Sequence, residues 1–120
     1  MPMVRVSNGG TDGLIPDGKL IILGFGTMSS SNMFFDIPKS SSSAITLNNY
    51  RQVVVPCKNI TTLHWQCDYS VLHPYGYIKD GDVTSVGDLR QSTTISIDKS
   101  YSYLTICDIT GNYAATFWFD

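Results

Sequence analysis

Cysteine and histidine are two residue types in this sequence that could hold a metal or act in nucleophilic chemistry. The chain has three cysteines, Cys57, Cys67 and Cys107, and two histidines, His64 and His73. The His64–Cys67 spacing is short, but a structural zinc site normally uses a second close pair, and no Cys-x-x-Cys is present. Residues an odd number apart on a strand also point to opposite faces. We therefore predict no metal site and no cofactor.

A cysteine nucleophile needs a histidine within hydrogen-bond distance of an activated thiol. Cys67 with His73, or Cys107 with His64, would meet that requirement only if the fold happened to bring them together. An odd number of cysteines leaves at least one thiol unpaired in an oxidising compartment. We expect free thiols buried in the core of a protein made in a reducing cytosol, with a Cys57–Cys67 bridge across a strand pair as the alternative.

All 10 acidic residues are aspartates, and three of them, Asp80, Asp82 and Asp88, lie close together in the sequence. Such carboxylates could act as general acid and base, or supply hard oxygen ligands to calcium. However, Asp80-Gly81-Asp82 is also typical of a polar turn, because a short carboxylate bonds nearby backbone N–H groups. We assign Asp80-Gly81-Asp82 to a turn, and a small hydrolase ranks third among the functions considered.

The second half of the chain is rich in tyrosine and tryptophan, which favour protein interfaces and sugar-stacking platforms. Together with nearby aspartates, such rings could stack against a sugar and bond its hydroxyls. A carbohydrate-binding module is therefore the second hypothesis, and its candidate ligand-binding residues are Trp65, Tyr75, Tyr77, Asp80 and Asp82.

The last segment of the chain is apolar on both faces of a strand, with Phe117 and Phe119 on one side and Trp118 on the other. Contiguous apolar surface beyond a few hundred Å² usually marks a contact. The alternative is that one face fills the core and Trp118 lies under a loop. The first hypothesis is a non-catalytic assembly module that forms a homo-oligomer or docks on a larger protein complex. Its candidate interface residues are Leu20, Ile22, Phe34, Phe35, Tyr113, Phe117, Trp118 and Phe119.

The elements that must position these side chains are β-strands. The chain has no Glu and only three Ala, so two of the best helix formers are nearly missing. Short extended segments separated by turn residues recur at the spacing of a sandwich or barrel. The sequence predicts one all-β domain over residues 1–120, an antiparallel β-sandwich or jelly-roll-like barrel with about nine or ten short strands and little or no helix.

Several local features follow from this pattern. Asp80-Gly81 predicts a tight turn, and Gly87 predicts a bulge or bend in the strand that follows. Residues 20–23 are apolar without alternation, so we expect both faces of their strand to be covered. Alternation in the last third predicts a three-stranded antiparallel meander, with strands over 93–97, 101–109 and 113–119.

Charge and hydropathy exclude several classes of partner. The net charge is -2, and the eight basic residues are spread singly, whereas nucleic-acid binding needs clustered Lys or Arg. The apolar runs are far shorter than the roughly 20 residues of a membrane span. Met1–Arg5 has no signal-peptide pattern, so we expect synthesis in the cytoplasm without a signal peptide, unless the chain has already been trimmed.

The opening segment Met3-Val4-Arg5-Val6-Ser7, with Asn8-Gly9-Gly10 and the abundance of Ser, Thr, Gly and Asn, resembles the small accessory structural proteins of tailed-phage virions. The resemblance covers about the first ten residues and the composition, and no family residue can be carried over. It implies a tail, baseplate or capsid-decorating role without catalysis, in which many copies in a virion add modest contacts by multivalency. Sugar binding at the tip of a virion is the alternative most closely related to this role.

Overall fold

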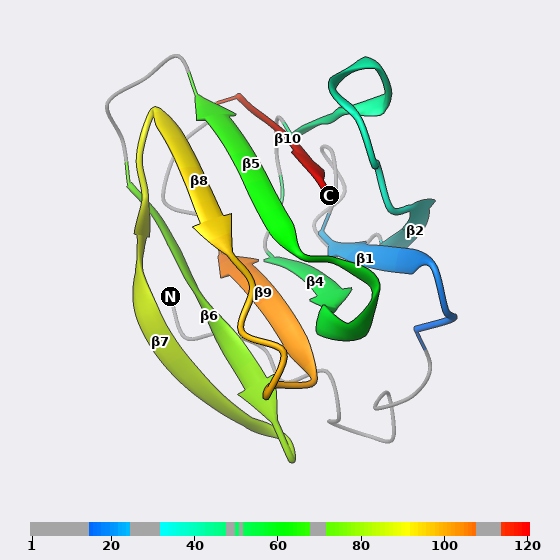
Figure 1. Ribbon diagram of the computed structural model, residues 1–120, viewed down its shortest axis with the longest axis vertical. Helices are drawn as coiled ribbons and strands as arrows, with labels where there is room; N and C mark the ends of the chain where they lie inside the picture. Colours follow the sequence, from blue (N-terminus) through cyan, green and yellow to red (C-terminus); the bar gives the residue numbers. More distant parts are fainter. Residues whose placement is uncertain (1–14, 25–31, 48–49, 51, 68–71, 108–113) are drawn as a thin grey trace.

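The computed structural model describes residues 15–24, 32–47, 50, 52–67, 72–107 and 114–120, which form two antiparallel sheets packed face to face (Figure 1). The predicted all-β sandwich is confirmed. The six-stranded sheet has the order β2-β1-β4-β9-β6-β7, and the four-stranded sheet has the order β3-β10-β5-β8. The strand bounds are β1 Lys19–Leu23, β2 Asn32–Asp36, β3 Ile45–Leu47, β4 Gln52–Pro56, β5 Thr62–Cys67, β6 His73–Lys79, β7 Asp82–Leu89, β8 Ser92–Ser96, β9 Tyr103–Cys107 and β10 Ala115–Phe119.

The only helical elements among the described residues are two short 3-10 turns, η2 at Ser41–Ser43 and η3 at Cys57–Asn59. This agrees with the expectation of little or no helix. No helix in the described part of the chain is long and apolar enough to cross a membrane.

The main core lies between the two sheets and is built by alternating side chains from each. Phe117 and Trp65 enter it from the four-stranded sheet, and Ile22, Val53 and Ile106 enter it from the six-stranded sheet. All five side chains are at most 1% exposed. Because successive residues of a strand point to opposite faces, one face of every core strand is sealed inside the molecule.

A second, smaller apolar cluster lies outside the main core. It contains Ile15, Val54, Ile78 and Tyr103, and Ile21 packs against it. Ile21 follows Leu20 on β1 and therefore points away from the main core. One face of the strand is therefore buried in the main core, and the other face, with Ile21 and Leu23, is half-buried, where Ile21 packs against residues of the same chain.

The hairpin of β6 and β7 turns at Asp80 and Gly81, which have φ angles of 53° and 81°. Positive φ at both central residues is the geometry that Asp-Gly favours in a two-residue hairpin. The pairing register shifts between Tyr75 and Gly76, opposite Gly87 and Ser85. The predicted turn is confirmed, and the irregularity predicted at Gly87 lies beside that residue.

The predicted meander of the last three strands is wrong. β8 pairs with β5, β9 pairs with β4 and β6, and β10 pairs with β3 and β5. The consecutive strands therefore alternate between the two sheets. The turn after Asp98 carries the chain across the sandwich instead of folding it into a hairpin. The strand expected at residues 3–7 and the turn expected at 110–112 lie outside the described residues.

Candidate functional site

The outer face of the four-stranded sheet is a surface of small uncharged polar side chains around one aromatic pair. Alternation directs one residue in two from each strand to this face. The partly or fully exposed side chains there are Thr46 from β3, Thr116 and Trp118 from β10, Thr62, His64 and Gln66 from β5, and Ser92, Thr94 and Ser96 from β8. Their hydroxyl and amide groups can each donate and accept hydrogen bonds.

Trp118 and His64 form the aromatic pair. They are directly opposite each other in the β10–β5 register, and their ring centroids are 5.1 Å apart with an interplanar angle of 15°. His64 Nε2 lies 2.8 Å from Asp120 Oδ2. The main chain of Asp120 is fixed as well, because its N–H donates to Thr62 O and its carbonyl accepts from Thr61 N–H. The stack is therefore held from two sides before any ligand binds.

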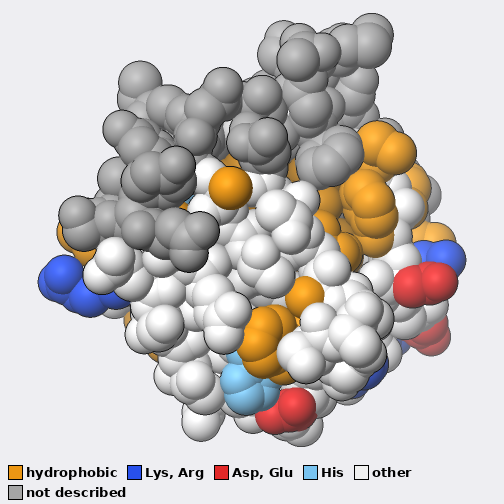
Figure 2. Space-filling view, turned by 90° about the horizontal axis from the view of Figure 1, so that it is seen from above, with side chains coloured by type: hydrophobic (Ala, Val, Ile, Leu, Met, Phe, Trp, Pro, Cys, Tyr) orange, Lys and Arg blue, Asp and Glu red, His pale blue; other side chains and the backbone are white. Residues whose placement is uncertain are grey.

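This arrangement is accessible from solvent. The side chain of His64 is 27% exposed and that of Asp120 is 58% exposed, while Trp118 is half-buried. Figure 2 shows a histidine beside an acidic and a hydrophobic side chain. Of the two histidines, only His64 reaches the surface, since His73 is 1% exposed.

A hollow of about 150 Å³ lies beside Trp118, between β5 and β8. His64, Gln66, Ser92 and Thr94 also line it. The hollow is smaller than the roughly 300–1,000 Å³ of a pocket that encloses a drug-sized molecule. The hollow can hold one part of a ligand that lies across the sheet. A flat face of that ligand would pack against the indole, and its hydroxyls would point toward the polar side chains.

The structure places half of the predicted interface residues in the molecule's own core. Leu20, Ile22, Phe117 and Phe119 are 0% exposed. They face the opposite sheet, so no partner can contact them without unfolding the sandwich. Assigning these four residues to an interface is a mistake, because a strand with two apolar faces can be covered entirely within one chain.

The other predicted interface residues are more accessible or lie outside the described part. Phe34 on the edge strand β2 is 50% exposed, and Phe35 is half-buried against the main core. Trp118 faces outward, in the pair described above. Tyr113 lies outside the described residues.

The five residues predicted to bind a ligand do not form a surface site. Trp65 is 1% exposed, Tyr75 is 8% exposed and Tyr77 is 4% exposed. Asp80 and Asp82 are exposed at the β6–β7 turn. That prediction is therefore wrong, since the rings pack inside the sandwich and the carboxylates lie at its end.

Sequence reasoning missed the combination of Trp118, His64 and Asp120. The alternation in β10 places Trp118 on the face opposite Phe117, and this signal is visible in the sequence. The register that sets His64 against Trp118 is not visible there, because the two residues are 54 positions apart and pair only across the sheet.

A second histidine lies inside the sandwich in a chain of hydrogen-bonding groups. His73 Nδ1 is 2.8 Å from Tyr50 Oη, and His73 Nε2 is 4.0 Å from Cys67 Sγ. Tyr50 Oη donates to the Cys107 carbonyl. A neutral imidazole donates from one ring nitrogen and accepts at the other, so His73 can bond Tyr50 and Cys67 at the same time.

Cys67 and His73, considered above as a nucleophile and base, are thus brought together, but in a buried place. Burial lowers the pKa of His73, so the imidazole stays neutral and does not hold a thiolate by its charge. All three cysteines are buried thiols, as expected, and burial raises the pKa of Cys57 to about 12. His64 points outward and Cys67 inward, and the described residues contain no group of three metal-ligating side chains.

No known family model matches this sequence, and no curated protein or solved structure shows significant similarity to it.

Proposed function

We propose that this protein is a carbohydrate-binding module whose ligand lies across the outer face of β10, β5 and β8. The observation that carries the proposal is the stack of Trp118 on His64, held by Asp120, in a face otherwise made of hydroxyl and amide side chains. A sugar has an apolar C–H face and a rim of hydroxyls, and this surface offers an aromatic ring and hydrogen-bonding groups side by side.

The charge of the face favours a neutral sugar. Asp120 carries the only carboxylate among the described residues named on this surface, and the basic side chains described in the chain belong to other elements. A carboxylate beside the aromatic pair repels an acidic sugar and accepts hydrogen bonds from the hydroxyls of a neutral one.

A panel of neutral saccharides tests the proposal through tryptophan fluorescence. The chain has two tryptophans, and Trp65 is sealed in the core, so a change in emission on binding reports Trp118. Binding to the variants is measured by titration calorimetry, because replacing Trp118 removes the fluorescent reporter. Trp118→Ala should weaken binding by about three- to tenfold, and Trp118→Phe, which keeps a ring, by less. Val86→Ala on β7 of the other sheet is the matched control and should bind as the unaltered protein does. A flat response across the whole panel would contradict the proposal.

Self-association is a second candidate function, and the exposed apolar side chains of β2 favour it. Met33 is 44% exposed and Phe34 is 50% exposed, and β2 is an edge strand of the six-stranded sheet. An edge strand presents unpaired backbone groups to another chain. The virion role that the resemblance implies fits either candidate, because many copies can add weak contacts.

A further inference from the structure

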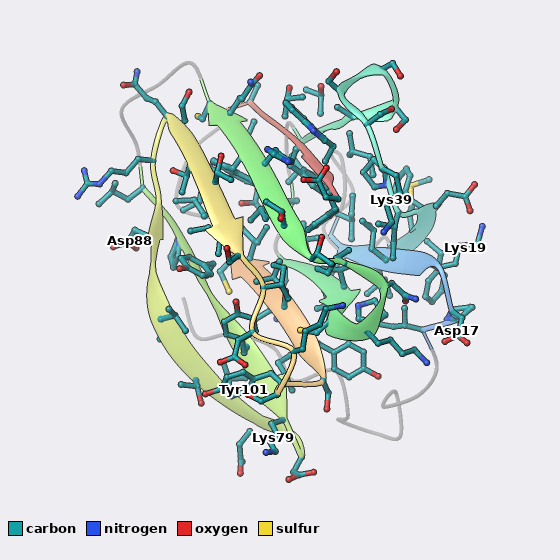
Figure 3. The ribbon with its side chains drawn as sticks, viewed as in Figure 1. Asp17, Lys19, Lys39, Lys79, Asp88 and Tyr101 are labelled. Carbon is teal, nitrogen blue, oxygen red and sulfur yellow. The ribbon has the colours of Figure 1, made fainter. Side chains whose placement is uncertain are left out.

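A groove separate from the Trp118 face opens beside the start of β9. Its volume is about 340 Å³, which falls in the range of roughly 300–1,000 Å³ typical of small-molecule sites. Its polar lining comes from Asp17, Lys58, Lys99, Tyr101, Ser102 and Tyr103. In Figure 3, Asp17 lies at the right of the view and Tyr101 at the lower left, and both line this groove although they come from segments far apart in the sequence. The tertiary structure brings these groups together, and no local sequence motif predicts the groove.

The turn that carries Lys99 and Tyr101 is rigidly built. Asp98 Oδ1 accepts hydrogen bonds from the backbone N–H and the hydroxyl of Ser100, at 3.0 and 2.6 Å. The ring of Tyr101 stacks on Tyr77, with centroids 4.8 Å apart and an interplanar angle of 14°. One wall of the groove is thus fixed in place before a ligand enters, which lowers the entropic cost of binding.

Ammonium groups converge around the 3-10 turn η3. Lys58 Nζ is paired with Asp17 Oδ1 at 2.6 Å, and Lys99 Nζ donates to the Lys58 carbonyl at 3.3 Å. Lys39 donates to the Asn59 carbonyl. An ammonium has three protons, so Lys99 can donate to a ligand while it keeps this bond. Among the described residues, no carboxylate forms an ion pair with Lys99.

The rest of the lining is amphipathic. Ser102 and the two tyrosines supply hydroxyl groups, while Pro56 and Ile15 supply apolar surface. Two lysines against one aspartate leave an excess of positive charge in the groove. A ligand that fits it therefore combines an anionic group with a body that has an apolar face and hydroxyls.

We propose that this groove binds a saccharide unit that carries a carboxylate, such as a uronic acid. The carboxylate lies at Lys99, away from the Lys58–Asp17 ion pair, and the sugar ring lies along Tyr101 and Ser102. This site takes an acidic sugar, whereas the Trp118 face takes a neutral one, and neither depends on the other.

Titrations followed by backbone amide NMR test the proposal with three probes. Glucuronate carries both the ring and the carboxylate, glucose lacks the charge, and acetate lacks the ring. We expect glucuronate to shift the amide signals of Lys99, Tyr101 and Ser102 in a saturable way, and more strongly than either other probe. If glucuronate shifts none of these amide signals, the proposal is overturned. If acetate shifts them as strongly as glucuronate does, the groove binds any small anion, and the proposal is also overturned.

Charge-matched variants locate the binding. Lys99→Gln should weaken glucuronate binding by about tenfold, because it removes one charge-assisted hydrogen bond. Lys79→Gln makes the same change in net charge at the end of β6 and should leave binding within about twofold of the unaltered protein. Equal losses in both variants would show a non-specific charge effect and overturn the proposed site. Trp118→Ala should retain glucuronate binding, so failure of one proposal does not imply failure of the other.

Discussion

The imidazole of His73 is held on both nitrogens inside the sandwich. Tyr50 contacts Nδ1 and Cys67 contacts Nε2, and the ring of Trp65 packs edge-on against it at a centroid distance of 5.0 Å. A protonated imidazole would place a charge among apolar side chains, which is costly where the ring is buried. Burial therefore favours the neutral form of this histidine.

Stability should consequently fall at acidic pH. Burial lowers the pKa of His73 in the folded protein below its ordinary value of 6.5. The unfolded chain then binds the proton more readily, so the free energy of unfolding should decrease as pH drops below about 6.5. Urea denaturation between pH 7 and pH 5 measures this decrease. The decrease should be smaller in His73→Asn and should persist in His64→Asn, and an equal slope in His73→Asn would contradict the assignment.

At the scale of elements, the β6–β7 hairpin depends on a glycine at one position. A Cβ added at Gly76 would lie 2.2 Å from the carbonyl oxygen of Thr84 on the partner strand. Real Cβ atoms do not approach backbone oxygen so closely, and both strands would have to separate. The register shift at this point brings the two backbones together, and only glycine allows that approach.

Alanine substitutions at two glycines test this reading of the hairpin. Gly76→Ala should lower the free energy of unfolding by about 1–3 kcal/mol, the usual cost of forcing extra volume into a packed site. Gly87→Ala is the matched control, because its added Cβ would meet only the Tyr75 ring, at an ordinary 3.5 Å. Chemical denaturation of both variants gives the comparison. If both variants lose the same free energy of unfolding, the close approach of the two strands at Gly76 is not the reason that glycine is needed there.

At the scale of the whole molecule, both edges of the six-stranded sheet expose apolar side chains, and one edge exposes more of them. Met33 and Phe34 are neighbours on β2, so their side chains lie on opposite faces of that edge. At the other edge, β7 carries exposed Val86 beside the polar residues Ser85 and Asp88. The two edges differ in apolar character, and the more apolar one is the better candidate for contact between copies.

The molecular mass in solution tests whether this edge joins two chains. If β2 mediates association, light scattering at increasing protein concentration should show a mass above the 13.2 kDa of one chain. Phe34→Ser with Met33→Ser should return the protein to a monomer, whereas Val86→Ser at the opposite edge should not. A monomer at every concentration would remove the assembly proposal and leave ligand binding as the function to pursue.

Much of the fold was determined by residue order alone. Missing helix formers, regular turn residues and alternating apolar side chains predict a β-sandwich, and Asp80-Gly81 predicts its hairpin, because these signals act over a few neighbouring residues. The same alternation separates Trp118 from Phe117. The alternation does not show which face of the strand packs against the opposite sheet and which is exposed to solvent. The interface prediction was wrong at Phe117 for that reason.

Only the tertiary structure decided which distant segments lie side by side. The last strands cross between sheets instead of forming a meander, and this crossing sets Trp118 against His64 and places Lys99 beside Lys58. Pairing of strands far apart in the chain depends on packing of the whole core, so local sequence carries little information about it. The residue types of both proposed sites were visible in the sequence. Which of these residues lie next to each other depends on how the strands pair and how the two sheets pack.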